Sequence, residues 1–405
     1  MIKLLQCAKG PVMSGAFFFE FCKPECQLHG IIWPMKEFLK KLIQADSGPD
    51  AGELNASGVI QKAFEGYGIE CEMDVWDGNR ANVMARVRTP GQRKALMIVC
   101  HHDVVSPGDV PWDHDPFSGL ELDGVIHGRG ATDMKGGIVA AVTAMGQLVS
   151  EDVALQGDII FAATAGEETD SCGVDRFVQN ATDLPDLAGI MIPEPTGFDM
   201  INAHRGLLWL EISTVGKTAH GSKPHLGVNA IKAMALVLDR LETVIDFSRV
   251  THPDLGTGSM SINTISGGKA LNVVPDHCCL GVDIRTLPGQ DHQGLLAQVQ
   301  ALLDALTRDH SDFNANVTIQ RSMEALETDP QSGFVKAVCD ATDIQSLKSV
   351  GFTTDGPKLT PLGVPILVFG PGDGAMCHKP NEFISIADLE QGVAYYKQII
   401  TALLT

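Results

Sequence analysis

Apolar and polar residues follow two different patterns along the chain, and the change from one pattern to the other indicates two kinds of domain. Between residues 35 and 205, short apolar runs of strand length alternate with stretches of helical spacing. This pattern predicts helices over 35–44 and 138–148, and strands over 83–87, 95–99, 158–164 and 187–192. Continuous apolar runs are typical of parallel strands buried on both faces. The pattern therefore predicts an α/β fold with a doubly wound, mostly parallel sheet.

The pattern of apolar and polar residues changes after Arg205-Gly206. Strand alternation or helical spacing then predicts, in order, a strand, a helix, two strands, a helix and a strand, over 207–215, 228–244, 260–265, 278–284, 294–306 and 315–320. This order predicts a small ferredoxin-like α+β domain. The buried-strand pattern resumes at 364–369, and residues 388–403 predict a closing helix. We therefore expect a large domain made of residues 35–205 and 321–405, with the small domain inserted at 206–320.

Residues that can bind metal follow the apolar runs of the large domain. The runs at 95–100, 159–163, 187–192 and 364–369 lead in turn to His101-His102-Asp103, Glu167-Glu168, Glu194 and His378. In open α/β sheets, ligands bind at the edge where the carboxyl ends of the strands meet. We therefore expect these side chains to lie close together in the folded chain.

A Gly-rich turn at 128–137 adds Asp133, just before the helix predicted at 138–148. Imidazole and carboxylate groups suit zinc or a similar divalent ion. One ion needs three protein ligands and a water, whereas five ligands, one of them bridging, suit two ions about 3.5–4 Å apart. Taken singly, Asp133 could be a helix N-cap, Glu167-Glu168 a solvated loop pair and His378 an ordinary loop histidine. Their joint placement at strand ends favours a metal centre.

Seven segments of the chain resemble, in the same order, those of a known enzyme family. It is the two-zinc metallopeptidase family of acetylornithine deacetylase, succinyl-diaminopimelate desuccinylase, aminoacylase and glutamate carboxypeptidase. The resemblance runs from about Met35 to the C-terminus. The segments are CHHDVVSPGDVPWDHDPF, DGVIHGRGATDMKGG, AGEETDSCG, PEPT, GKTAHGSKPHLGVNAI, LNVVPDHCCLGVDIRTLP and FGPGDGAMCHKPNEF. Each segment alone is a weak signal, whereas seven in the family's order are specific.

The resemblance implies a role for each candidate residue of the large domain. It implies two divalent ions, zinc with cobalt as a possible substitute, held by His101 and Glu194 on one side, Glu168 and His378 on the other, and Asp133 between them. It also implies that Glu167 is the general base and that Asp103 orients His101. The large domain would then be the catalytic domain.

The doublet His101-His102 departs from the family, whose members usually carry a small or apolar residue where His102 stands. Residues two apart in a strand share a face, so His101 and Asp103 can touch while His102 points away. A carboxylate that holds a metal-bound imidazole is the expected arrangement around such a ligand. We therefore expect His101 to be the ligand.

The resemblance also assigns the small domain, which in this family is a lid that mediates dimerisation. His220, in the segment GKTAH, would donate to the oxyanion of the reaction in the partner's active site. Asn272 and Arg285 would hold the substrate carboxylate. Without the resemblance, His220 would be an exposed histidine and Arg285 a surface strand residue. We therefore expect a homodimer formed through the small domain.

The resemblance favours hydrolysis of an N-acyl amino acid. Family members with Glu at the position of Glu194 are deacylases and carboxypeptidases, which implies a small-molecule substrate with a free carboxylate. The segment Thr354-Asp355-Gly356-Pro357 lacks the Arg that the desuccinylase branch carries shortly after this motif, so acetylornithine-type deacylation is slightly favoured. A metallocarboxypeptidase or dipeptidase, a hydrolase of ureido compounds and a non-catalytic metal-binding relative stay open. The presence of Glu167 argues against the non-catalytic relative.

The composition argues against some classes of binding partner and indicates the compartment in which the protein works. A net charge of −20 argues against nucleic acid and anionic membranes, because phosphate binding needs clustered Lys and Arg. Ten scattered cysteines are typical of reduced thiols in a cytoplasmic protein. No run approaches the roughly 20 apolar residues of a membrane span. The family resemblance begins near Met35, so residues 1–34 are interpreted as an extension of unknown role or the product of an upstream start codon.

Overall fold

The large domain is built on a nine-stranded sheet. The structure, a computed structural model, describes residues 31–405, so the extension expected at 1–34 lies almost wholly outside the described residues. In the sheet, β16 (Leu347–Val350) lies beside β8, and the other strands follow the order β1 (Glu70–Trp76), β2 (Arg80–Val87), β6 (Ile159–Thr164), β3 (Ala95–His101), β7 (Leu187–Ile192), β17 (Ile366–Val368), β8 (Met200–His204), β15 (Leu326–Glu327).

The centre of this sheet is parallel. Strands β6, β3, β7 and β17 are neighbours that run in the same direction, whereas β1, β2 and β15 pair antiparallel. Every residue of β3, β6 and β17 is buried, as expected for strands covered on both faces. The carboxyl ends of the four central strands therefore meet along one edge of the sheet.

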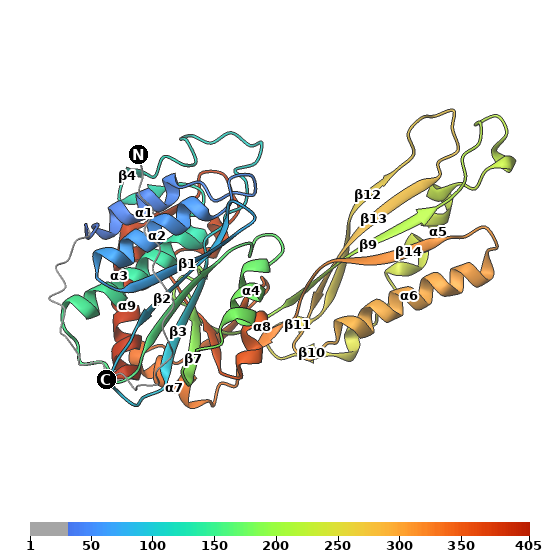
Figure 1. Cartoon of the computed structure of the whole chain (residues 1–405). Coiled ribbons are helices and arrows are strands. Elements are labelled where there is room, and N and C mark those ends of the chain that lie inside the picture. Colours follow the sequence, from blue (N-terminus) through green and yellow to red (C-terminus); the bar gives the residue numbers. More distant parts are fainter. Residues whose placement is uncertain (1–30) are drawn as a thin grey trace, which may run out of the picture.

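Helices cover both faces of the large sheet (Figure 1). One layer contains α1 (Met35–Gln44), α2 (Leu54–Gly66), α3 (Gly136–Ser150), α7 (Gly333–Thr342) and α9 (Ile386–Leu404), and the other face carries α4 (Cys172–Asn180) and α8 (Gly356–Leu359). Helix α3 is buried along most of its length because it packs against the sheet strands β3 and β6 and against the helices α1, α2 and α9 on either side. Within residues 31–405, no helix is long and apolar enough to cross a membrane.

The small domain is an antiparallel sheet with helices on one face. Its strand order is β12 (Ser259–Gly267), β13 (His277–Thr286), β9 (Gly206–Val215), β14 (Ala315–Met323), and its helices are α5 (Ala230–Leu241) and α6 (His292–Asp309). Apolar residues at alternate strand positions pack beneath the helices, among them Leu208, Leu210 and Ile284. The connectivity is ferredoxin-like, so the expected fold class is confirmed. The domain limits drawn at residues 205 and 320 stay a prediction.

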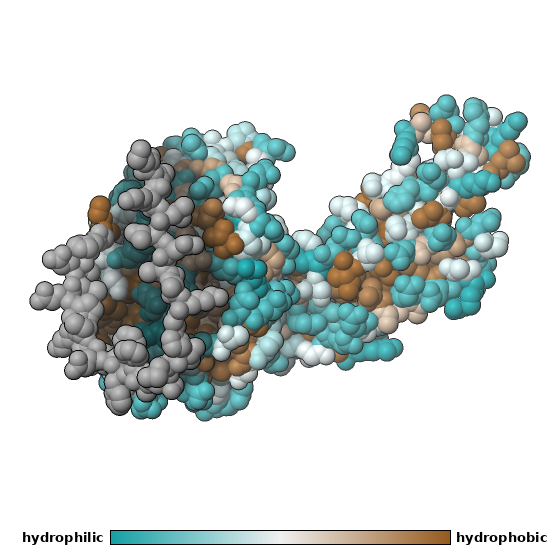
Figure 2. All heavy atoms as spheres, in the orientation of Figure 1, coloured by the Kyte–Doolittle hydropathy of each residue, from teal (hydrophilic) through white to brown (hydrophobic). Residues whose placement is uncertain are grey.

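Two neighbouring segments join the domains. Arg205 separates β8 from β9, and β14 continues into β15 after Met323. At the base of the small sheet, Leu207 lies opposite Met323. A Cβ on Gly206 would lie 2.3 Å from the Oγ1 atom of Thr286, so only glycine fits where these strands leave the large domain. The small domain projects from this junction, with an open gap between it and the large domain (Figure 2).

Two smaller sheets are also present among the described residues. A hairpin of β10 (Thr251–His252) and β11 (Gly256–Thr257) lies at the junction, where the Arg205 guanidinium donates to the carbonyl oxygen of Thr257 at 2.8 Å. A three-stranded sheet on the large domain joins β4 (Leu120–Leu122), β5 (Val125–His127) and β18 (Phe383–Ser385). This second sheet fixes the two turns that flank it, which carry Asp133 and His378.

Candidate metal centre

The parallel strands bring the expected ligands together at one edge of the sheet. His101 ends β3, Glu168 follows β6, Glu194 follows β7 and His378 lies in the loop beyond β17. Asp133 comes from the turn before α3. These residues form two groups whose ligand atoms lie within 4.8 Å of one another, His101 with Asp133 and Glu194, and Asp133 with Glu168 and His378.

Asp133 is shared between the two groups. Its Oδ1 atom lies 3.1 Å from the Nε2 atom of His101, and its Oδ2 atom lies 3.3 Å from the Nε2 atom of His378. The Nε2 atom of His101 is also 3.6 Å from Oε1 of Glu194, and that of His378 is 3.0 Å from Oε1 of Glu168. One carboxylate with an oxygen on each side is the arrangement that two bridged ions require.

The carboxylates of the centre repel one another, and they draw the two histidines toward their charged forms. Burial raises the pKa of Glu194 and of Glu168, and the other carboxylates of the centre raise both further. Hydrogen bonds to Asp133 and Glu168 raise the pKa of His378 to about 10. Burial acts to lower the pKa of His101, but Glu194 and the neighbouring aspartates outweigh it and hold that pKa well above its usual value. Bound divalent cations would relieve the same repulsion, so the donor set fits two such ions.

His102 points away from the centre. Its Nδ1 atom donates to the carbonyl oxygen of Thr164 at 3.0 Å, so its Nε2 atom accepts from the hydroxyl of Ser57 at 2.8 Å. Burial lowers the pKa of His102 to about 4, which keeps the ring neutral. The alternation expected along this strand is therefore what the structure shows, with His101 on the metal side.

Asp103 has two kinds of contact. The Nδ1 atom of His101 lies 3.1 Å from the main-chain carbonyl oxygen of Asp103 and 3.5 Å from its carboxylate. The carboxylate itself accepts from the main-chain N–H groups of Glu167 and Glu168, at 3.1 and 3.0 Å. Asp103 thus lies beside the ring as expected, and it also holds the loop that carries both glutamates, which the sequence did not indicate.

Glu167 lies beside the ligands but belongs to neither group. Its side chain is largely buried, and burial raises the pKa of its carboxyl well above the usual value, with Asp355 and the neighbouring glutamates adding to the rise. A cavity of about 210 Å³ opens onto the centre and is lined by Asp133, Glu167, Glu168, Glu194, Pro195, Phe352, Thr353, Gly374, Cys377 and His378. A carboxylate in this position can exchange a proton with a molecule in the cavity.

Glu382 is a residue of the centre that the sequence did not single out. It is fully buried, and its Oε1 atom accepts from the N–H groups of Thr132 and Asp133 at 2.9 and 3.1 Å. Its Oε2 atom accepts from the guanidinium of Arg129 at 2.6 Å. Glu382 therefore fixes the turn that presents Asp133. It lies within the segment FGPGDGAMCHKPNEF, but nothing in that segment indicates this contact.

The expected residues of the small domain, His220, Asn272 and Arg285, belong to neither ligand group and do not line the cavity of the centre in their own chain. His220 is exposed near the end of the small sheet that is farther from the junction, where it pairs with Val273 and its Nδ1 atom contacts the hydroxyl of Ser222 at 2.7 Å. Asn272 lies beside it, because its carbonyl oxygen accepts from the N–H of Gly221 at 2.7 Å.

Arg285 lies at the opposite end of β13 from these two residues, paired with Asp283 at 2.9 Å. The strand from His277 to Arg285 spans roughly 26 Å at the usual rise per residue. Asn272 and Arg285 therefore cannot hold the same carboxylate within one chain. The expectation that they act as a pair requires a second chain and stays a prediction.

Known proteins are similar to this chain in sequence and in architecture. Residues 97–402 match the profile of peptidase family M20/M25/M40. The chain is 31% identical over 366 residues to an acetylornithine deacetylase of Myxococcus xanthus, covering 88% of this chain and 93% of that protein. It is 28% identical over 386 residues to a Staphylococcus epidermidis protein named "Probable succinyl-diaminopimelate desuccinylase", covering 87% and 93%. The structure of an M20 family metallo-carboxypeptidase from Sulfolobus solfataricus has the same fold, with a TM-score of 0.78 at 18% identity over 91% of this chain and 98% of that one.

Proposed function

The chain belongs to peptidase family M20/M25/M40 and is a hydrolase, and on this premise we propose that it cleaves the amide bond of an N-acyl amino acid. The family expected from the seven motifs is thereby confirmed. The observation that carries the proposal is the shared Asp133, with a ligand group on each side and Glu167 buried beside both. This is the arrangement expected of a two-metal hydrolase with a separate proton carrier.

In this proposal His101, Glu194 and Asp133 hold one ion, while Glu168, His378 and Asp133 hold the other. When bound, two divalent ions supply Lewis acidity to a water and to the scissile carbonyl. We propose zinc, with cobalt able to replace it, because imidazole and carboxylate donors suit both metals.

Glu167 acts as the general base in this scheme. Its carboxylate takes a proton from the attacking water and later delivers it to the leaving amine. Two features support the role, the raised pKa that burial gives this carboxyl and its place outside both ligand groups. Asp103 contributes by accepting hydrogen bonds from the main-chain N–H groups of Glu167 and Glu168. These bonds hold the base Glu167 and the ligand Glu168 in fixed positions relative to each other.

We propose a small substrate with a free carboxylate. Arg285 lies on the open face of the small sheet, where its Nε and Nη2 atoms contact the carboxylate of Asp283, so the Nη1–Nη2 edge of its guanidinium is left to bind a substrate carboxylate. Acetylornithine-type deacylation is favoured over desuccinylation, because Thr354-Asp355-Gly356-Pro357 lacks the following Arg. A metallocarboxypeptidase or dipeptidase is the second candidate, since the same guanidinium can hold the terminal carboxylate of a peptide.

We further propose a cytoplasmic homodimer formed through the small domain, with no nucleic acid or membrane partner. Strand β12 lies at the edge of its sheet, and unpaired strand edges readily pair with another chain. Large apolar side chains are exposed in the same part of the molecule: Leu226, Ile231, Ile265, Leu271 and Val273. His220 lies among these segments, so a partner seated there could receive it in its own active site.

Metal analysis and a substrate panel test the proposal. Purified protein should contain up to two zinc-like ions per chain, chelation should abolish turnover, and Zn²⁺ or Co²⁺ should restore it. The panel should compare N-acetyl, N-succinyl, N-formyl and N-carbamoyl amino acids with dipeptides, scored by the free amine released. Full activity in metal-stripped protein would contradict the mechanism, and cleavage of dipeptides alone would favour the second candidate.

A further inference from the structure

Arg321 reaches from the sheet of the small domain, whose last strand runs to Met323 and so past the expected limit at residue 320, to the catalytic loop of the large domain. It belongs to β14, and its Nη2 atom donates a hydrogen bond to the main-chain carbonyl oxygen of Glu167. The same nitrogen lies 3.9 Å from the Oε1 atom of Glu167, and the side chain is only 15% exposed. A residue of one domain thus contacts both the backbone and the carboxylate of the proposed base in the other.

A β-bulge turns Arg321 toward this contact. Ile319 lies opposite Leu210 and packs against the helix-covered core of the small domain. Strict alternation would send Arg321 to the same face. The register shifts between Ile319 and Arg321, so that Gln320 is the extra residue and Arg321 lies opposite Trp209 on the open face. Bulges next to active sites commonly redirect a side chain in this way.

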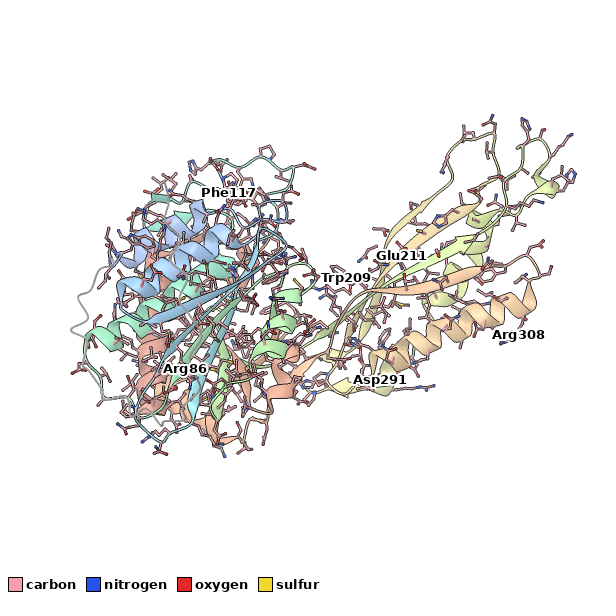
Figure 3. All side chains as sticks on the ribbon, viewed as in Figure 1. Arg86, Phe117, Trp209, Glu211, Asp291 and Arg308 are labelled. Carbon is pink, nitrogen blue, oxygen red and sulfur yellow. The ribbon has the colours of Figure 1, made fainter. Side chains whose placement is uncertain are left out.

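Trp209 provides a platform for the guanidinium of Arg321. The charged carbon lies 5.7 Å from the centre of the Trp209 ring, within the range of a cation–π interaction. Trp209 is 39% exposed, and Figure 3 shows it on β9 close to the junction of the two domains. Stacking holds the guanidinium plane while leaving its N–H groups free to donate along the edge.

The loop that carries Glu167 is therefore held from both domains. Asp103 of the large domain accepts from the N–H groups of Glu167 and Glu168, and Arg321 of the small domain donates to the carbonyl of Glu167. Asp355 is a further buried carboxyl near Glu167; burial raises its pKa to about 6, and the nearby charge of Arg321 acts in the opposite direction. Because Arg321 is carried by the small sheet, a rotation at the two linking segments would move it relative to Glu167.

We propose that Arg321 is a positioning residue for Glu167, through which the orientation of the small domain sets the geometry of the catalytic loop. The inference rests on the proposed role of Glu167 as general base. Arg321 belongs to neither ligand group and does not line the cavity of the centre. Its loss should therefore change the rate of the chemical step more than substrate binding or metal content.

The first test compares Arg321→Ala and Arg321→Lys with a matched control, Arg308→Ala. Arg308 is exposed on α6 of the same domain, away from the junction (Figure 3). Arg321→Ala should lower kcat by about 10–100-fold, the effect of losing a charge-assisted hydrogen bond. KM and metal content should stay within about threefold of wild type. Arg321→Lys should recover only part of the loss, because an ammonium cannot both stack and donate as a guanidinium does.

Guanidinium rescue separates positioning from a general structural role. Millimolar guanidinium ion should restore part of the kcat of Arg321→Ala, because the space left beside Trp209 and Glu167 can accept it, and should not change Arg308→Ala. A loss of kcat that matches a loss of folded protein, with no rescue, would overturn the proposal.

A second test needs no substrate. Amide hydrogen exchange in residues 166–171 should be faster in Arg321→Ala by about tenfold, while the core strands of both domains and the Arg308→Ala control stay unchanged. Unchanged exchange together with wild-type kcat would overturn the inference. If Glu167→Ala kept full activity, the proposed base would be wrong, yet the exchange experiment would still show whether Arg321 holds the loop.

Discussion

Glu167 and Glu168 are neighbours in the sequence with different surroundings in the fold. The carboxylate of Glu168 contacts His378, whereas that of Glu167 lies outside both ligand groups. Glu167→Ala should therefore lower kcat by roughly 10²–10⁴-fold and leave the metal content near wild type. Glu168→Ala should lose metal. Steady-state kinetics and metal analysis of the two variants check this, and the opposite pattern would show that the two roles are exchanged.

His204 gives the fold a measurable sensitivity to acid. Its Nδ1 atom donates to the carbonyl oxygen of Arg205 at 2.8 Å, its Nε2 atom accepts from the Thr354 hydroxyl at 3.0 Å, and burial lowers its pKa to about 4. The unfolded chain binds a proton near pH 6.5 and the folded chain does not, so the stability that the neutral ring contributes is lost as the pH falls from about 6.5 toward 4.

The expected size of this loss is about 2 kcal/mol between pH 7 and pH 5 for one such histidine. His204→Asn keeps a donor and an acceptor but cannot titrate, so its free energy of unfolding should fall less over the same interval. Urea unfolding of both proteins at the two pH values is the measurement. Equal pH dependence in the two proteins would show that His204 does not contribute to the acid sensitivity.

At the scale of elements, the sequence predicted the parts whose pattern is set by burial. Strands β3, β6 and β7 and helix α3 lie in the centre of the large domain. Their continuous apolar runs predicted that these elements would be buried. Because such strands deliver their next residues to one edge, the metal-ligand residues could be expected to meet there. The order of elements likewise predicted the ferredoxin-like sheet.

Other features could not be predicted because contacts distant in sequence decide them. The short strands β15 and β16 exist through pairing with β8 rather than through their own pattern. The bulge at Gln320 depends on the register against β9, so nothing in the local sequence showed which way Arg321 would point. The contact of Glu382 with the Asp133 turn joins residues far apart in the chain.

The close approach of α3 to the sheet gives a prediction at the same scale. A Cβ on Gly137 would lie 2.0 Å from the carbonyl oxygen of Pro193, the residue before Glu194. Gly137→Ala should therefore push α3 away from this loop, lower the free energy of unfolding by about 1–3 kcal/mol, and weaken metal binding as Asp133 and Glu194 separate.

A matched control for this change is Gly333→Ala at the first position of α7, where a Cβ meets nothing within 4 Å. That variant should change stability by no more than about 1 kcal/mol and keep its metal affinity. Urea unfolding and zinc titration compare the two. A Gly137→Ala protein as stable as wild type would show that α3 can shift without cost.

At the scale of the whole molecule, the position of His220, outside the metal centre of its own chain, leads to a prediction about the activity of mixed dimers. If His220 serves the partner, the homodimers of His220→Ala and of Glu167→Ala should each be nearly inactive. In a mixed dimer, the His220→Ala subunit keeps Glu167 and receives an intact His220, so one of its two sites is complete. Random exchange makes half the dimers mixed, and activity should return to about a quarter of wild type.

The experiment is to co-express or co-refold the two inactive variants and assay the mixture. Two distinguishable tags and a pull-down establish that mixed dimers have formed. No return of activity in a preparation that demonstrably contains them would place His220 within its own chain or outside the reaction.

The pairing of Leu207 with Met323 at the base of the small sheet has a consequence for the history of this protein. Antiparallel partners have Cα atoms about 4.5–5.5 Å apart, a distance that a two-residue turn can close. The inserted segment therefore leaves and re-enters the large domain at one point, so it forms a module whose two ends are adjacent. A lineage can gain, lose or exchange such a module in a single event. The sheet that presents the metal ligands need not be rebuilt when it does.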